Sequence, residues 1–144
     1  MSERIRVLIL CTGNSARSQM AEGLLRHDGG KLFAVESAGL EPSFVRTEAI
    51  QAMREIGIDI SGHRSKSIGE FTGQPFDHVI TVCDNAQQNC PVFPATTHRI
   101  HWSIDDPAAA EGDEQLRLTA FRSARDNLRK RLNKFIEETR PADN

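Results

Sequence analysis

The sequence contains no tyrosine, a single tryptophan and three cysteines among 144 residues. An odd number of cysteines argues against a framework of paired structural disulfides. The longest apolar run, around residues 7–10, is far too short to cross a membrane or to serve as a secretion signal. The net charge of -2 gives no basic surface for nucleic acid or anionic lipid. We therefore expect a cytoplasmic protein that binds neither nucleic acid nor membrane.

The remaining composition is that of an ordinary globular protein, with 38% hydrophobic and 26% charged residues. A chain of this length buries about two-thirds of its unfolded surface, so it needs neither a disulfide nor a metal in order to fold. We expect one domain over residues 1–144, ending in a frayed tail at 141–144, and a monomer as the default state.

Short apolar, β-branched segments alternate with segments of helical periodicity. The expected strands are residues 5–10, 32–35, 78–82 and 99–102. The expected helices begin at Ser15, cover residues 47–55, and follow an apolar stripe made by Leu118, Phe121, Leu128, Leu132 and Phe135. This alternation predicts an α/β fold, with an open parallel sheet of about four strands and helices on both faces.

Three side chains that can act as a nucleophile or an acid follow predicted strands. Cys11, Cys83 and Asp106 come after the first, third and fourth strands of the chain. The carboxyl ends of parallel strands meet at one edge of a sheet, where ligands bind in such folds. We therefore expect these three residues to converge on one site.

The loop after the first strand has the features of an oxyanion site. Backbone N–H groups of such a loop and the N-terminus of the following helix attract anions. Gly13 and Asn14 tolerate the left-handed backbone of such a loop, and Arg17 matches two oxygens of a tetrahedral anion. The predicted oxyanion-binding residues are Thr12, Gly13, Asn14, Ser15, Ala16, Arg17 and Ser18.

The same loop is expected to activate the thiol of Cys11. A helix N-terminus and a nearby cation lower the pKa of a cysteine, so Cys11 is predicted to be a thiolate nucleophile that Ser18 helps to stabilise. The alternative is that Cys11 is a buried cysteine at the end of a strand and Arg17 a surface residue. The spacing of cysteine, arginine and hydroxyl at a strand–helix junction favours the functional interpretation.

Residues 11–17, continuing to Glu22, resemble the anion loop of low-molecular-weight protein tyrosine phosphatases and of the related thioredoxin-coupled arsenate reductases. Residues 82–91, which include Cys83 and Cys90, resemble the redox segment found in the arsenate reductases and lacking in the phosphatases. Residues 101–107 resemble the stretch that carries the general acid before a proline, which indicates Asp106 rather than the adjacent Asp105. Residues 36–39 and 57–63 match as well, so the resemblance covers nearly the whole chain.

The resemblance implies arsenate reduction through three thiols, as in arsenic detoxification. Cys11 attacks arsenic while Asp106 protonates a departing oxygen, Cys83 then attacks Cys11 and releases arsenite, and Cys90 attacks Cys83. Thioredoxin is the implied electron donor, no cofactor is bound, and phosphate or sulfate would compete with arsenate. A glutaredoxin or a small thiol remains an alternative reductant.

A disulfide between Cys83 and Cys90 has a geometric consequence. Seven helical steps rise about 10.5 Å, whereas a disulfide needs its Cα atoms within roughly 4.4–6.8 Å. We therefore expect residues 83–90, if helical when reduced, to unwind on oxidation and to carry the disulfide to its reductant. Asp84, Asn85 and Asn89 are weak helix formers, which favours this change.

Three other interpretations remain open. A zinc site would use Cys83, Cys90, His98 and His101, but the gap between the cysteines exceeds the usual ligand spacing, so we predict no metal. A tyrosine phosphatase would usually place tyrosines after the Asp-Pro acid, where this chain has only alanines, so only weak hydrolysis of small aryl phosphates is expected. A non-enzymatic oxyanion or redox sensor is the third possibility.

Two positions depart from the arsenate reductase pattern. Several members carry a cysteine where this chain has Ala16. The absence of that cysteine is expected to remove a site of oxidative damage. Some members bind potassium beside the loop through an asparagine, a glutamate, a serine and an aspartate. Asn14, Glu22 and Ser37 match that set, but Lys66 occupies the aspartate position. We predict that its ammonium group takes the place of the cation.

Overall fold

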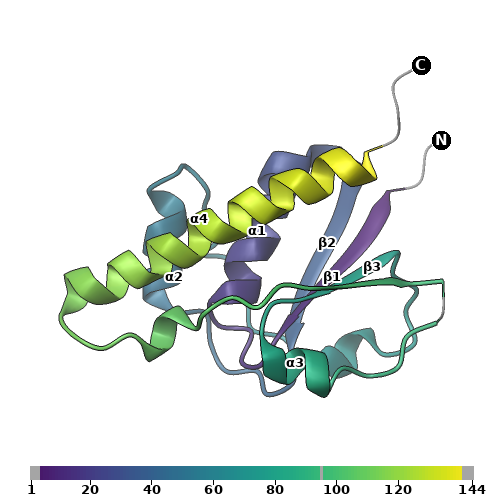
Figure 1. Cartoon of the computed structure of the whole chain (residues 1–144), viewed down its shortest axis with the longest axis horizontal. Coiled ribbons are helices and arrows are strands. Elements are labelled where there is room, and N and C mark those ends of the chain that lie inside the picture. Colours follow the sequence, from purple (N-terminus) through teal and green to yellow (C-terminus); the bar gives the residue numbers. More distant parts are fainter. Residues whose placement is uncertain (1–3, 95, 141–144) are drawn as a thin grey trace.

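A computed structural model describes residues 4–94 and 96–140, so the predicted frayed tail at 141–144 lies outside the described residues. Strands and α-helices alternate along the chain (Figure 1). Short 3-10 turns lie between some of them. The elements are β1 (Ile5–Cys11), α1 (Arg17–Gly29), β2 (Phe33–Gly39), α2 (Thr47–Arg54), β3 (His78–Thr81), α3 (Asp84–Gln88), β4 (His98–His101) and α4 (Glu114–Thr139).

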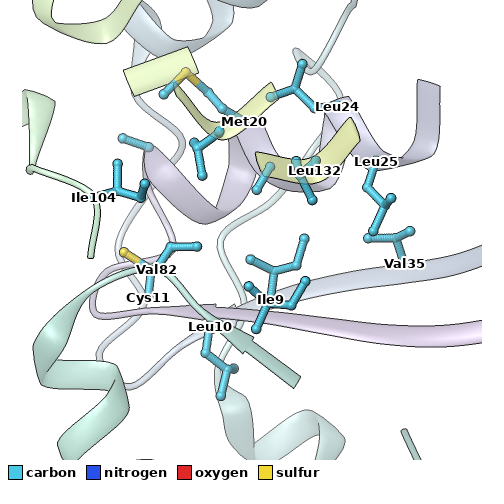
Figure 2. Close-up of a cluster of buried hydrophobic side chains, with 14 of the residues drawn as sticks. Ile9, Leu10, Cys11, Met20, Leu24, Leu25, Val35, Val82, Ile104 and Leu132 are labelled. Atoms are coloured by element: carbon cyan, nitrogen blue, oxygen red, sulfur yellow. The ribbon is translucent and has the colours of Figure 1, made fainter. Parts of the chain in front are cut away.

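The four strands form one parallel sheet in the order β2-β1-β3-β4. Strand β1 lies in the middle, and its last residue, Cys11, is paired with Gly39 of β2. Side chains of β1 are buried on both faces of the sheet: Ile9 points toward α1 and α4, while Leu10 points to the opposite face (Figure 2). This burial explains the continuous apolar run in the sequence, because parallel strands are covered on both sides.

Helices cover both faces of the sheet, which confirms the predicted fold class. Helices α1 and α4 pack together on one face, and α3 lies on the other (Figure 1). Leu132 of α4 joins Leu24 and Leu25 of α1 in the core between these helices and the sheet (Figure 2). The apolar stripe predicted for the last helix is therefore its packing face. No helix among the described residues is long and apolar enough to span a membrane.

The boundaries of two elements differ from the prediction by more than one residue. Strand β2 continues to Gly39, four residues beyond the predicted end at Val35, because Glu36 to Gly39 pair with the carboxyl half of β1. Helix α1 begins at Arg17 rather than at Ser15. Both differences concern the edge of the sheet where Cys11 lies, and pairing across strands decides them rather than local hydrophobicity.

Candidate active site

The loop between Thr12 and Ala16 connects the central strand β1 to α1. The carbonyl oxygens of Thr12, Gly13 and Ser15 accept hydrogen bonds of 2.8 to 3.1 Å from backbone N–H groups of residues 41–46. A trans peptide places its N–H opposite its carbonyl, so the N–H groups that follow these carbonyls face the other side of the loop. N–H groups arranged in this way beside the N-terminus of α1 are suited to hold an anion. The left-handed backbone predicted for Gly13 is not observed.

Asn14 adopts the predicted left-handed backbone, with φ of 48°, and is completely buried. Its amide nitrogen donates to the hydroxyls of Ser18 at 2.7 Å and Ser37 at 3.0 Å. Its amide oxygen accepts from the side chain of Gln19 at 2.9 Å and from the backbone N–H of Lys66 at 2.8 Å. These bonds hold a conformation that a non-glycine residue rarely takes, so Asn14 shapes the loop.

Ser18 is therefore oriented differently from the prediction. Its hydroxyl oxygen accepts the hydrogen bond from Asn14. The structure gives no hydrogen bond from Ser18 to the sulfur of Cys11 among the described residues, where the backbone N–H of Thr12 is the donor that lowers the pKa of that thiol. Ser18 contributes to the site by holding Asn14.

Cys11 and Cys83 are both buried, and their thiols share a hydrogen bond. The hydrogen bond from Cys11 lowers the pKa of Cys83 to about 5, with further hydrogen bonds from Thr12 and from the backbone N–H of Ala86. The same hydrogen bond, together with burial, raises the pKa of Cys11. The prediction of a lowered pKa at Cys11 is therefore wrong, because it ignored the second thiol. The surroundings of the pair therefore favour the thiolate form of Cys83 over that of Cys11.

Arg17 and Asp106 lie beside this pair of thiols. Arg17, the first residue of α1, donates to the carbonyl of Ile104 at 2.9 Å, and another of its guanidinium nitrogens is 3.9 Å from a carboxylate oxygen of Asp106. Asp106 caps the 3-10 turn Pro107–Ala109 by accepting from the N–H of Ala108 at 3.0 Å. Its side chain is 46% exposed, so it stays accessible to a ligand and to solvent protons.

Cys90 lies apart from the other two thiols. It follows α3, whose first turn is capped by the sulfur of Cys83. The half-buried side chain of Cys90 lines a cavity with Val79, Arg99 and Ile100 on the outer part of the sheet. Burial raises the pKa of Cys90. The structure thus brings Cys11, Arg17, Cys83 and Asp106 together and separates Cys90 from them by the length of α3.

A buried ion pair is connected to the anion loop through hydrogen bonds. The ammonium group of Lys66 is 3.2 Å from Glu22 and 3.2 Å from Glu36. Glu22 also accepts a 2.6 Å hydrogen bond from Ser37, which itself receives one from Asn14. The ammonium group of Lys66 therefore contacts Glu22, one of the residues that the resemblance associates with potassium.

His101, weighed from the sequence only as a possible zinc ligand, links α3 to the sheet. Its ring bonds Thr81 at 2.7 Å through Nδ1 and Asp84, the first residue of α3, at 3.0 Å through Nε2. The parallel pairing of β3 with β4 sets Thr81 opposite His101. The contact between His101 and Asp84 joins the start of α3 to the edge of the sheet. It depends on the pairing of β3 with β4, whose paired residues are about twenty positions apart in the sequence. No group of three metal-binding side chains occurs within residues 4–94 and 96–140.

This chain is similar to known proteins over most of its length. A family model described as low molecular weight phosphotyrosine protein phosphatase matches residues 6–142. An arsenate reductase of Halalkalibacterium halodurans is 45% identical over 131 residues, which are 91% of this chain and 94% of that protein.

Solved structures show the same fold. An arsenate reductase in the oxidized state superposes with a TM-score of 0.80 and 35% identity, over 92% of this chain and 97% of that one. A thioredoxin-dependent arsenate reductase of Corynebacterium glutamicum superposes with a TM-score of 0.72 and 28% identity. That match covers 96% of this chain and 65% of the longer one.

Proposed function

Since this chain belongs to the low molecular weight phosphotyrosine protein phosphatase family, with arsenate reductases among its relatives, we propose that it reduces arsenate to arsenite by a cascade of three thiols. The observation that carries the proposal is the hydrogen-bonded pair of Cys11 and Cys83 at the anion loop. A phosphatase needs one nucleophilic sulfur, whereas a two-electron reduction needs two that can form a bond with each other.

In the first step Cys11 attacks arsenic. Arsenate sits in the cradle of backbone N–H groups, with two of its oxygens facing Arg17. The proton of Cys11 moves to Cys83, which frees the Cys11 thiolate. A sulfur–arsenic bond forms, and Asp106 protonates the departing oxygen so that it leaves as water.

In the second step Cys83 attacks the sulfur of Cys11. Hydrogen bonds from Thr12 and from the N–H of Ala86 favour the thiolate of Cys83, which gives up its proton to solvent. The new disulfide replaces the sulfur–arsenic bond, whose electron pair passes to arsenic. Arsenic is reduced from the +5 to the +3 state, two thiols are oxidised, and arsenite leaves.

In the third step Cys90 attacks Cys83 and releases Cys11 as a thiol. The remaining disulfide between Cys83 and Cys90 is reduced by exchange with an external dithiol. We propose thioredoxin as that dithiol. Val92, two residues after Cys90, is 93% exposed and offers an apolar contact for such a partner.

Turnover can be measured as NADPH consumption with arsenate, thioredoxin and thioredoxin reductase. Wild type is expected to turn over, and Cys11→Ser, Cys83→Ser and Cys90→Ser are each expected to lose at least a hundredfold in rate. Replacement of the thioredoxin system by glutaredoxin and glutathione tests the identity of the reductant. Normal steady-state turnover by any of the three variants would contradict the cascade.

A single-turnover assay without reductant assigns the order of the thiols. Cys90→Ser is expected to release one arsenite per chain and to accumulate the disulfide between Cys11 and Cys83. Cys83→Ser is expected to release none, because no second sulfur can attack Cys11. Arsenite release by Cys83→Ser would refute the proposed second step.

Weak phosphatase activity is a second candidate function. It is favoured by the closeness of Arg17, an anion-binding side chain, to Asp106, a potential general acid. Phosphate ester hydrolysis needs these two residues and the Cys11 nucleophile, but not Cys83. Hydrolysis of p-nitrophenyl phosphate is therefore expected to be slow, to survive in Cys83→Ser and to disappear in Cys11→Ser. The chain has no tyrosine to pack against an aryl group, which explains why the activity should be weak.

A further inference from the structure

We propose that Asn85 is a positioning residue that directs the hydroxyl proton of Thr12 toward the sulfur of Cys83. The side-chain nitrogen of Asn85 donates to the hydroxyl oxygen of Thr12 at 3.0 Å. That oxygen lies 3.3 Å from the sulfur of Cys83. A hydroxyl has one proton, and because the oxygen already accepts from Asn85, its own proton is free to point to the sulfur.

The orientation of the Asn85 amide is itself set by a neighbour. The side-chain nitrogen of Asn89 donates to the amide oxygen of Asn85 at 2.8 Å and to its backbone carbonyl at 3.0 Å. With its oxygen engaged in this way, Asn85 presents its nitrogen to Thr12. The three side chains form a chain of hydrogen bonds with one direction, from Asn89 through Asn85 and Thr12 to Cys83.

This chain of hydrogen bonds depends on the helical state of α3. Asn85 and Asn89 are four residues apart, the spacing at which side chains meet on one face of a helix. Thr12 belongs to the anion loop, 73 positions from Asn85. These hydrogen bonds therefore make the most reactive form of Cys83 depend on a folded α3. Unwinding of α3 removes the hydrogen bonds of both asparagines.

The consequence for catalysis rests on the proposed function. Cys83 must be a strong nucleophile when it attacks Cys11, and at that point α3 is folded. Once the disulfide with Cys90 forms, α3 has opened and Thr12 no longer receives a hydrogen bond from Asn85. The donor to Cys83 is thus oriented in the reduced protein and released in the oxidised one.

The pKa of Cys83 tests the inference without any arsenate turnover. In a Cys11→Ser, Cys90→Ser background Cys83 is the one remaining thiol, and its pKa follows from the rate of alkylation by iodoacetamide against pH. Asn85→Asp has the same shape but can only accept, so it draws the Thr12 proton away from the sulfur. We expect the pKa of Cys83 to rise by about one unit, the size expected for loss of a hydrogen bond to a charged group.

Controls separate this effect from charge and from helix stability. The new carboxylate of Asn85→Asp also acts directly on Cys83, so the same change is made in a Thr12→Val background, where only the direct effect remains. We expect the shift to be at least halved there. Gln88→Ala, an exposed change on the same helix, should leave the pKa unchanged, and Asn85→Gln should restore part of the wild-type value.

Two results would overturn the proposal: an unchanged pKa of Cys83 in Asn85→Asp, or an equal shift with and without the Thr12 hydroxyl. Circular dichroism of each variant checks that the fold is retained. A protein that fails to reduce arsenate but shows the expected thiol shifts would refute the proposed function alone, while normal turnover with no shift would refute the role of Asn85 alone.

Discussion

Lys66 and Glu22 show how a buried charge is held in this protein at the scale of single residues. Their side chains are 8% and 2% exposed, and the ammonium lies 3.2 Å from the carboxylate. Removal of one partner leaves the other charged in a region with little water. Glu22 also contacts Ser37, and Ser37 contacts Asn14, so the ion pair is connected to the anion loop.

We predict that Lys66→Met lowers the free energy of unfolding by about 3 kcal/mol, since breaking a buried ion pair from one side costs about this much. Urea unfolding at neutral pH measures the change. Lys134→Met, an exposed lysine of α4, is the matched control and should change the stability by less than about 0.5 kcal/mol. Equal effects of the two substitutions would show that the contact of Lys66 with Glu22 contributes little.

Potassium should have no specific effect on the wild-type protein, because the Lys66 ammonium already neutralises Glu22. Lys66→Asp is predicted to acquire a potassium dependence, with a melting temperature higher in potassium chloride than in sodium chloride of equal ionic strength. Ligand binding to the folded state alone produces such stabilisation. A specific increase in wild-type activity or stability with potassium would contradict the prediction.

His63 gives a pH dependence with a defined sign. Burial lowers the pKa of His63 below 6.5, and its ring contacts the side-chain oxygen of Gln19 at 3.0 Å. The unfolded chain therefore binds a proton at His63 at a higher pH than the folded chain does, so stability falls as the pH drops below about 6.5. We predict that the loss of stability between pH 7.5 and 5.5 is smaller in His63→Gln.

The exposed His27 provides the control for that measurement. His27→Gln should leave the pH dependence of urea unfolding as in wild type. If the curve of His63→Gln instead ran parallel to the wild-type curve across the same pH range, another group would have to account for the acid sensitivity.

At the scale of elements, α3 is the segment built to change. It has five residues, and its N-terminus is capped by the sulfur of Cys83, a group that the proposed reaction consumes. His101 holds Asp84 at the start of the helix, while Asn85 bonds Thr12 near the anion loop. These few contacts are polar and lie at the surface, so their loss costs much less than the loss of core packing.

We predict that oxidation of Cys83 and Cys90 opens α3, because the two Cα atoms must approach to within roughly 4.4–6.8 Å. Hydrogen exchange measured by mass spectrometry should show faster exchange of residues 84–89 in the oxidised protein. Peptides from α4 provide an internal control with unchanged protection. Equal protection of α3 in both states would mean that the disulfide forms without unwinding.

At the scale of the whole molecule, α4 closes the core over α1 and α2. Its apolar stripe packs against α1, and Arg129 forms two hydrogen bonds with Asp28 at the end of that helix. Arg117 and Arg125 connect α4 to Glu48 and Glu55, which belong to or directly follow α2. The last helix of the chain thus holds together elements from its first half.

Leu128 is completely buried in this interface, so Leu128→Ala is predicted to lower the free energy of unfolding by 2–5 kcal/mol, the typical range for such a cavity. Denaturant unfolding of the reduced protein measures the loss. The thiol chemistry should remain intact under native conditions, because Leu128 belongs to α4 and not to the anion loop or to α3. Leu116→Ala, at an exposed position, is the control. A stability equal to wild type would place Leu128 outside the core.

Much of the fold was predictable, because hydrophobic period and turn residues report local structure. The strands, the long helix and the parallel sheet were predicted from those patterns, and the positions of Cys11, Cys83 and Asp106 after strands followed from them. The end of β2 was missed, since Glu36 and Ser37 are polar and only pairing with β1 makes them part of a strand.

The sequence by itself determined the alternating elements, the anion loop at the end of the first strand and the supply of three thiols, because residues close in the chain decide these features. The tertiary structure decided which side chains surround each sulfur and which asparagine contacts Thr12. Thr12 is 71 positions from Cys83, and 73 from Asn85. Proton positions depend on contacts of a few ångströms, and folding alone sets such distances between residues so far apart in the chain.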